Sequence, residues 1–248
     1  MSEFHQRLKS KITPCDTKPK ENEIDRIKRI YNSFIRDNDL YNEKTNSLLR
    51  TDVNLAFDEI KESIRRIINT YYTPEDIEHL KVLEVGTAWG QKLRMFIEFG
   101  FAPNNLFGVD LIPHFTEVAR RLSPKEMNYL LADSQYLPFP NATFDIVFQC
   151  ITFSSILDKT VRRNIGMEMT RVLTPKGLII WIDSGDSNDK SKYCGEVFYQ
   201  GIDFPEIRKE IFPGADIIRF PKIILKKDIF RKCLTSTEPG INQNIFYT

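Results

Sequence analysis

The sequence has few of the residues that build metal sites, disulfide frameworks or membrane spans. It contains four cysteines and three histidines in 248 residues, and no two cysteines form a C-x-x-C pair. This spacing indicates neither a disulfide framework nor a zinc site, so we expect no bound metal. Cys150 falls within an apolar run and is expected to be a small core residue. No apolar run approaches the length of a membrane span and the N-terminal stretch has no signal core, so we expect a reducing, cytoplasmic setting.

An excess of charge of either sign is also missing. Lysine and arginine total 35 against 34 acidic residues, which gives a formal net charge of +1 at pH 7. The overall charge therefore provides no attraction toward nucleic acid or an anionic membrane, and we expect neither as a partner. Basic clusters at residues 26–36 and 226–232 are the features that keep a nucleic-acid partner open.

The stretch that organises the chain is residues 81–90, KVLEVGTAWG. An apolar run that contains Glu84, followed by Gly86, Gly90 and the helix-forming residues 91–99, predicts a buried parallel strand, a tight turn and a helix. Glycines let the backbone approach a ligand closely, and the free N–H groups of the following helix bind polar ligand atoms. Alone, this pattern fits a nicotinamide-binding unit, a methyltransferase or an accidental match.

Four more strands are predicted in the central part of the chain, at residues 105–110, 127–133, 146–151 and 177–183. The first of them ends in Asp110, which follows Gly86 by 24 residues. That spacing fits the carboxylate that binds a ribose diol in a doubly wound fold. The alternative for Asp110 is an N-cap for a helix at residues 113–122.

The order of these motifs resembles the class I S-adenosylmethionine (SAM)-dependent methyltransferases, in the type 11-like subgroup that acts on small molecules and glycans. Residues 84–90 resemble the family motif E-x-G-x-G-x-G, with Ala88 at the middle glycine. Alanine demands a negative φ more strictly than glycine does. Residues 138–148 resemble the family segment LPFPDxSFDxV, and residues 171–177 resemble RVLKPGG. The likeness covers residues 81–183 and makes a nicotinamide-binding unit a poor fit.

The resemblance implies SAM as the cofactor and S-adenosylhomocysteine as the product. It implies these cofactor-binding residues: Glu84, Gly86, Thr87, Ala88, Gly90, Asp110, Leu111, Asp133, Ser134 and Gln149. In the family, the acid at Asp133 and its small polar neighbour hold the adenine. Gln149 is expected to fix the methionine end of SAM or an acceptor hydroxyl, with a solvent-facing amide as the alternative.

The expected fold is α/β, a doubly wound, seven-stranded and mostly parallel sheet of the Rossmann-like methyltransferase type, with an N-terminal helical cap. We expect a flexible lead-in at residues 1–20, the cap at 21–76, the SAM-binding domain at 77–228 and a C-terminal tail at 229–248. A helix at residues 204–212 and strands at 215–220 and 222–225 are expected to complete the domain.

Two amphipathic helices are predicted in the cap, one from residue 23 to residue 34 and one at residues 53–71. Either they only pack against the sheet, or they form a lid that shapes an acceptor pocket. If they form a lid, four tyrosines are pocket candidates: Tyr31, Tyr41, Tyr71 and Tyr72.

Methyl transfer from a sulfonium mainly requires that two bound partners are oriented and desolvated, and it needs a general base only where the acceptor arrives protonated. Asp183, Asp186 and, less favoured, His114 are the candidate bases. The alternative for the two aspartates is a solvated loop. The expected reaction is methylation of a small-molecule or glycan acceptor at a hydroxyl. A SAM-binding protein without catalysis and an RNA methyltransferase are the other two hypotheses.

Overall fold

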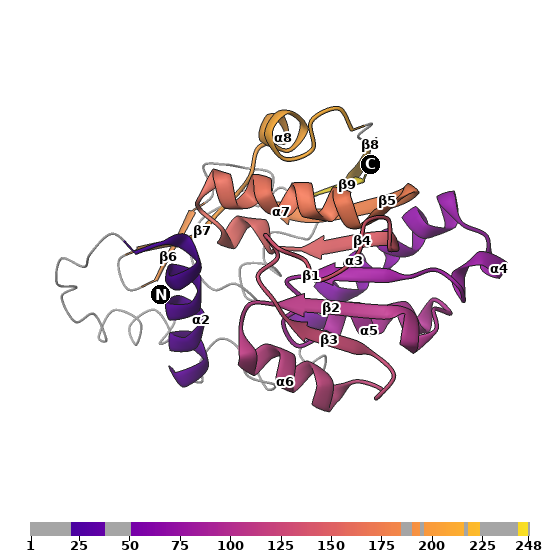
Figure 1. Cartoon of the computed structure of the whole chain (residues 1–248), viewed down its shortest axis with the longest axis horizontal. Coiled ribbons are helices and arrows are strands. Elements are labelled where there is room, and N and C mark those ends of the chain that lie inside the picture. Colours follow the sequence, from indigo (N-terminus) through magenta and orange to yellow (C-terminus); the bar gives the residue numbers. More distant parts are fainter. Residues whose placement is uncertain are drawn as a thin grey trace.

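Five parallel strands form the centre of the computed structural model, which describes residues 21–37, 51–184, 190–193, 196–215, 218–223 and 243–247. The strands are β1 (Val82–Val85), β2 (Leu106–Asp110), β3 (Asn128–Leu131), β4 (Phe144–Cys150) and β5 (Leu173–Ser184). They lie in the order β3-β2-β1-β4-β5, so all five carboxyl ends face one edge of the sheet (Figure 1). The Rossmann-like α/β prediction is confirmed at this level. Within the described ranges, no helix is long and apolar enough to cross a membrane.

Helices lie on both faces of the sheet (Figure 1). They are α2 (Glu23–Asp37), α3 (Thr51–Tyr71), α4 (Pro74–Ile77), α5 (Gln91–Glu98), α6 (Pro113–Leu122), α7 (Lys159–Val172) and α8 (Phe204–Glu206), with 3₁₀ turns η1 (Pro103–Asn105) and η2 (Phe153–Ser155) and a π-helical turn η3 (Ile207–Ile211). The period-two alternation of the strands divides the core. Ile146 and Phe148 of β4 pack with α3 and α5, whereas Val147 packs with α7. Side chains of neighbouring residues at a strand end therefore point to opposite faces.

The helical predictions hold, with small differences at the ends of the elements. The apolar stripe of α3 is buried through Ile60, Ile64 and Ile67, and α6 has the predicted bounds. Asp158 caps α7, because its side chain accepts hydrogen bonds from the N–H groups of Thr160 and Val161. The helix predicted at residues 204–212 consists of α8 and η3.

The far edge of the sheet differs from the prediction. Two antiparallel strands, β9 (Gln243–Tyr247) and β8 (Ile218–Ile223), follow β5, with β9 inserted between β5 and β8. β9 comes from the stretch assigned to the C-terminal tail. The strand break expected at Pro221 is wrong, because β8 continues through that proline with a register shift. Proline is tolerated there because β8 is the last strand in the order of the described sheet. One side of an edge strand has no neighbouring strand, so a residue that faces this side needs no N–H group for pairing.

Two other features of the sheets were not predicted. β6 (Lys190–Tyr193) and β7 (Glu196–Gln200) form a separate antiparallel pair. β5 begins at Leu173, four residues before the predicted start at residue 177, because the turn resembling RVLKPGG pairs with β4 across a bulge. Helix α2 stands across the carboxyl ends of the parallel strands, at the left of Figure 1. The predictions for residues 1–20 and for Tyr41 lie outside the described residues.

Candidate functional site

A cavity of about 270 Å³ opens at the carboxyl edge of the parallel strands. Its walls are the loop after β1, the ends of β2 to β4, and side chains of α2, α3 and α7. Six of the ten predicted cofactor-binding residues line it: Gly86, Ala88, Asp110, Leu111, Asp133 and Ser134. The strand-end positions singled out in the sequence therefore meet at one place.

The loop after β1 bends sharply because three of its residues take positive φ. These are Gly86 (72°), Ala88 (45°) and Gly90 (68°). A Cβ on Gly86 would lie 2.5 Å from Cγ2 of Thr152, and one on Gly90 would lie 2.7 Å from Cζ of Tyr129. Both glycines are thus required by conformation and by space.

Ala88 takes a backbone conformation that alanine disfavours more than glycine does. The alanine is held at φ 45°, in the left-handed region, where a Cβ is unfavourable. Ile151, which also lines the cavity, has φ 57°, an outlier for a β-branched residue. Two of the three non-glycine residues with positive φ in the described part of the chain therefore line this cavity, whereas the third, Ala142, does not.

Asp110 links the end of β2 to the glycine loop. Its Oδ2 accepts the N–H of Ala88 at 2.8 Å and its Oδ1 accepts the N–H of Ile112 at 2.9 Å. Burial raises the pKa of Asp110 to about 6, and these N–H groups oppose the shift. The carboxyl is therefore mostly ionised at neutral pH. The N-cap of α6 is Ile112, so Asp110 does not take the alternative role of capping residue.

Glu84 and Thr87 lie beneath the loop, outside the cavity lining. Thr87 Oγ1 donates to Glu84 Oε2 at 2.7 Å, and both residues are buried. Burial raises the pKa of Glu84 to about 7, with the charges of Lys92 and Arg94 and the Thr87 hydroxyl opposing the shift. Glu84 is close to half-protonated at neutral pH.

Asp133 and Ser134 form the wall beyond β3. Asp133 Oδ1 accepts the N–H of Gln135 at 2.9 Å, which fixes the carboxylate in the turn. Leu111 contributes an apolar surface next to Asp110. An acid, a small hydroxyl residue and an apolar side chain therefore surround this end of the cavity.

The structure does not bring Gln149 to the cavity. Its side chain is fully buried on the α7 face of the sheet, where Nε2 donates to the carbonyl of Ile182 and Oε1 accepts the N–H of Thr152. Both ends of the amide are thus used to join β4, β5 and the following loop. The structure therefore fits neither of the two roles expected for Gln149, a ligand-binding amide or a solvent-facing amide.

Asp183 is also placed away from the cavity lining. Its side chain is 1% exposed, and its Oδ2 accepts the N–H groups of Phe153 and Ser154 at 3.1 and 3.2 Å. This geometry fits a carboxylate that holds the η2 turn in place, not one that takes a proton from an acceptor. Asp186 lies outside the described residues. His114 is exposed and does not line the cavity.

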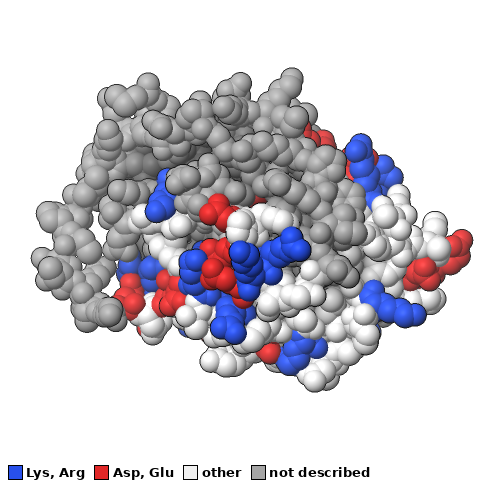
Figure 2. All heavy atoms as spheres, turned by 90° about the horizontal axis from the view of Figure 1, so that it is seen from above, with Lys and Arg blue, Asp and Glu red and all other residues white. Residues whose placement is uncertain are grey.

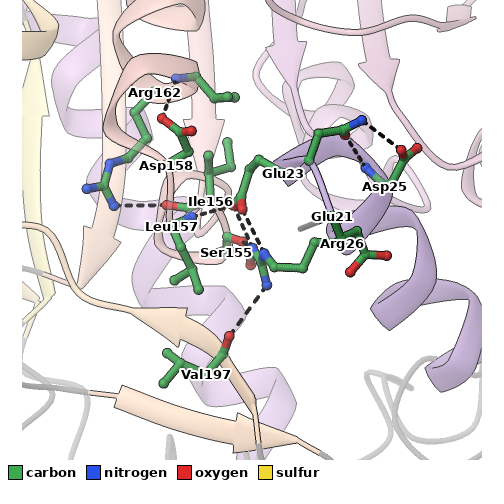
Figure 3. A network of polar contacts seen from close by, with 12 residues as sticks. Glu21, Glu23, Asp25, Arg26, Ser155, Ile156, Leu157, Asp158, Arg162 and Val197 are labelled. Atoms are coloured by element: carbon green, nitrogen blue, oxygen red, sulfur yellow. Dashed lines mark hydrogen bonds and ion pairs between the residues drawn. The ribbon is translucent and has the colours of Figure 1, made fainter. Parts of the chain in front are cut away.

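Helix α2 is joined to the η2 turn by a polar network (Figure 3). Glu23 Oε1 accepts the N–H of Leu157 at 2.5 Å, and Arg26 pairs with Glu23 and donates to the carbonyls of Ser155 and Val197. Deeper in, the hydroxyls of Tyr31 and Ser155 lie 2.8 Å apart, and both residues line the cavity. The sequence does not reveal this network, because its members are more than 120 positions apart.

Of the predicted pocket tyrosines that the structure describes, only Tyr31 lines the cavity. Tyr71 is 43% exposed, and the Tyr72 hydroxyl donates to the carbonyl of Asp145. The described residues contain no group of three or more acidic, cysteine or histidine side chains that is able to hold a metal ion. The site therefore offers backbone amides, two fixed carboxylates, hydroxyls and apolar walls.

Comparison with known proteins agrees with this arrangement. Residues 83–181 match the family described as methyltransferase domain. No curated protein matches the chain. Among solved structures, the YcgJ protein of Bacillus subtilis is 14% identical with a TM-score of 0.53, covering 75% of this chain and 96% of its own. A SAM-dependent methyltransferase of Methanosarcina mazei is 17% identical with a TM-score of 0.53, covering 73% and 95%.

At these identities the solved structures show a shared fold and not a shared activity. The match spans β1 to β5, which carry the glycine loop and the strand-end acids described above. Independently of that match, the cavity wall carries the carboxylates of Asp110 and Asp133, each held by backbone N–H groups. Residues 83–181 therefore match the methyltransferase domain family, on an α/β fold shared with a solved SAM-dependent methyltransferase.

Proposed function

We propose that this chain methylates a small molecule at a hydroxyl, using SAM bound at the carboxyl edge of the sheet. The observation that carries the proposal is the Asp110 carboxylate, which two backbone N–H groups hold at the cavity wall beside the glycine loop. A fixed, mostly ionised carboxylate is a suitable acceptor for both hydroxyls of a ribose.

The neighbouring residues fit the rest of the nucleoside. Asp133 and Ser134 supply acceptor and donor atoms for an adenine edge, and Leu111 supplies an apolar surface for its ring. The glycine loop brings backbone close to the ligand at Gly86 and Ala88. SAM supplies a methyl group on a positively charged sulfur. The chain's own residues have to orient the acceptor and exclude water.

The acceptor wall favours a small, mostly apolar molecule over a glycan. Ile24 and Ile27 of α2, Ile156 of the η2 segment and Ile165 of α7 line the cavity. Each hydroxyl of a sugar buried there would need a hydrogen-bond partner, and these four isoleucines offer none. The Tyr31–Ser155 pair is the one place on this wall where two hydroxyls lie together. We therefore assign the acceptor hydroxyl to that pair.

In this proposal α2 acts as a cap. It stands across the carboxyl edge of the sheet (Figure 1), and its polar network fastens it to the segment that Asp183 holds. Closing the cavity in this way removes water from the reacting groups. Asp183 then acts on the reaction only by positioning the η2 turn.

Two observations bear on an RNA substrate. Arg26 and Arg29, from the basic cluster in α2, are paired with Glu23 and Glu21, which leaves them less free for phosphates. On the face drawn in Figure 2, basic and acidic side chains are intermixed within the described part of the surface. The second basic cluster, at residues 226–232, lies outside the described residues.

The test is turnover with SAM labelled in the methyl group. Apolar alcohols and phenols, oligosaccharides and total RNA serve as three separate acceptor pools. We expect label in the first pool, with less than a tenth of that rate in the other two. Tight SAM binding without transfer to any pool supports a non-catalytic SAM-binding protein, and transfer to RNA alone refutes the small-molecule assignment.

A further inference from the structure

Arg162 of α7 is a buried charged side chain that the proposed reaction does not use. Its side chain is 3% exposed, and its Nη2 lies 2.7 Å from Oε1 of Glu206 in α8, whose side chain is 12% exposed. The cost of removing two charges from water can exceed their mutual attraction, so a buried ion pair is weak evidence for a role in stability. Lys159 also approaches the other oxygen of Glu206, at 3.5 Å, so Arg162 is not needed only to neutralise that carboxylate.

The second terminal nitrogen of the same guanidinium reaches the wall of the cavity. Arg162 Nη1 donates to the carbonyl of Ile156 at 2.9 Å (Figure 3). Ile156 lines the cavity and directly follows Ser155, whose hydroxyl lies 2.8 Å from that of Tyr31. Arg162 itself is not part of the cavity lining. One side chain therefore connects α8 to the residue beside the hydroxyl pair that we assign to the acceptor.

Each of the five residues 153–157 has a backbone N–H or carbonyl group bonded to a charged side chain. The bonds come from three elements: from Asp183 in β5, from Glu23 and Arg26 in α2, and from Arg162 in α7. Hydrogen bonds to ionised groups are roughly twice as strong as those between neutral groups. The cavity wall at this place is therefore held from three sides before an acceptor enters, which lowers the entropy that the reaction has to lose.

We propose that Arg162 is a positioning residue for the acceptor. By holding the Ile156 carbonyl, it keeps the neighbouring Ser155 hydroxyl beside Tyr31 while its own side chain stays outside the cavity lining. This inference rests on the proposed function, because it concerns the hydroxyl pair assigned there to the acceptor. The competing role is a purely structural ion pair that joins α7 to α8, and the two roles predict different losses when Arg162 is removed.

A positioning role affects the two halves of the cavity unequally. The glycine loop and the ends of β2 and β3 build the cofactor half, whereas the side-chain bonds of Arg162 go to Ile156 and to α8. A misplacement of about 1 Å can lower the rate of a reaction about a hundredfold. We therefore expect the loss of Arg162 to slow transfer to the acceptor by at least about tenfold and to leave the affinity for S-adenosylhomocysteine within about twofold.

Three variants separate the two roles. Arg162→Met removes the donor to Ile156, but it also leaves the Glu206 carboxylate without its buried partner, which destabilises the protein strongly. Arg162→Met combined with Glu206→Met removes both charges, and apolar residues in place of a buried pair are often tolerated, so this double variant should fold. Arg163→Met is the matched control, because Arg163 is the next residue of the same helix and is exposed outside the cavity.

Three measurements are made on each variant. Initial rates with methyl-labelled SAM at limiting concentrations of the alcohol and phenol pool report kcat/KM for the acceptor, and calorimetry gives the affinity for S-adenosylhomocysteine. Hydrogen exchange compares the amides of residues 153–157 with those of β1. In the double variant we expect at least about a tenfold loss of acceptor rate and at least about tenfold faster exchange at residues 153–157, with nucleoside affinity and β1 exchange within about twofold. Arg163→Met should match wild type in all three.

Equal losses of acceptor rate and of S-adenosylhomocysteine affinity overturn the inference and indicate a structural ion pair. An acceptor rate within about twofold of wild type overturns it as well, and so does unchanged exchange at residues 153–157. If Arg162→Met does not fold, the double variant decides. If wild type methylates nothing in the alcohol and phenol pool, the proposed function fails, and exchange at residues 153–157 still decides whether Arg162 holds this segment.

Discussion

We expect Gly86→Ala to destabilise the protein by about 2 to 5 kcal/mol through two separable costs. The residue has φ 72°, and holding an alanine there costs about 1 to 2 kcal/mol. The new Cβ would also lie 2.5 Å from Cγ2 of Thr152, and such overpacking costs about 1 to 3 kcal/mol. Only the second cost depends on Thr152.

The substitution Thr152→Ala separates the two costs, because it removes Oγ1 and Cγ2. Alone it loses the hydrogen bond from Thr152 Oγ1 to the carbonyl of Val85, which is worth about 1 kcal/mol. In combination with Gly86→Ala it relieves the overpacking, so the two changes should couple favourably by about 1 to 3 kcal/mol. Gly214→Ala is the matched control, since Gly214 has φ 80° and a Cβ there would meet nothing within 4 Å.

The assay is urea unfolding of the single and double variants, with stabilities compared at unchanged m-values. Gly214→Ala should cost about 1 to 2 kcal/mol and should add to Thr152→Ala without coupling. Additivity of Gly86→Ala and Thr152→Ala within about 0.5 kcal/mol refutes the close approach of the loop to Thr152. A Gly86→Ala variant as stable as wild type refutes the left-handed geometry as well.

Three further predictions concern single side chains. The folded-state pKa of Glu84 is raised from 4.5 to about 7, so its contribution to stability is present below pH 4.5 and lost as pH rises through 7. Glu84→Gln should therefore gain melting temperature over wild type as pH rises from 5 to 8, and parallel pH profiles contradict this. Asp183→Ala should lower the free energy of unfolding in urea by about 2 to 4 kcal/mol, because the N–H groups of Phe153 and Ser154 lose a charged acceptor. Asp183→Asn should lower it less. An Asp183→Asn variant with wild-type stability and no turnover restores Asp183 as a base. Tyr31→Phe should lower kcat/KM for the acceptor about tenfold with SAM affinity within about twofold, and an unchanged kcat/KM removes the Tyr31–Ser155 pair from the acceptor site.

The parallel part of the fold was readable from the sequence because its signals are local. Apolar runs bounded by glycines and acids mark the five strands, and the stripe of α3 and the proline at the start of α6 mark the helices between them. The antiparallel edge was not readable in the same way. β9 is inserted between two strands that precede it in the chain, and that pairing depends on the tertiary fold and not on any local pattern.

The site was predictable where backbone geometry determines it and not where side-chain direction does. Gly86, Asp110 and Asp133 line one cavity, as their positions at a turn and at strand ends led us to expect. Gln149 and Asp183 were misplaced because both point to the α7 face, where backbone N–H and carbonyl groups of neighbouring segments use their polar atoms. The alternation of side chains along β4 and β5 is the sequence signal that indicates this face for both residues.

Other cavity residues depend on contacts that sequence spacing does not encode. Tyr31 reaches Ser155 only because α2 crosses the carboxyl edge of the sheet. Lys92 lies on a predicted helix, but its place in the cavity follows from the packing of α3 against α5.

Calorimetric titration of wild type, Asp110→Ala and the surface control Glu126→Ala with SAM, S-adenosylhomocysteine and NADH tests the central claim most directly. We expect wild type and Glu126→Ala to bind both adenosyl ligands and not NADH. Asp110→Ala should stay folded by circular dichroism and lose at least about a hundredfold in affinity, as expected when a charged acceptor of two hydroxyls is removed. Unchanged affinity in a folded Asp110→Ala variant contradicts the assignment of this carboxylate to the ribose, and with it the position of the cofactor.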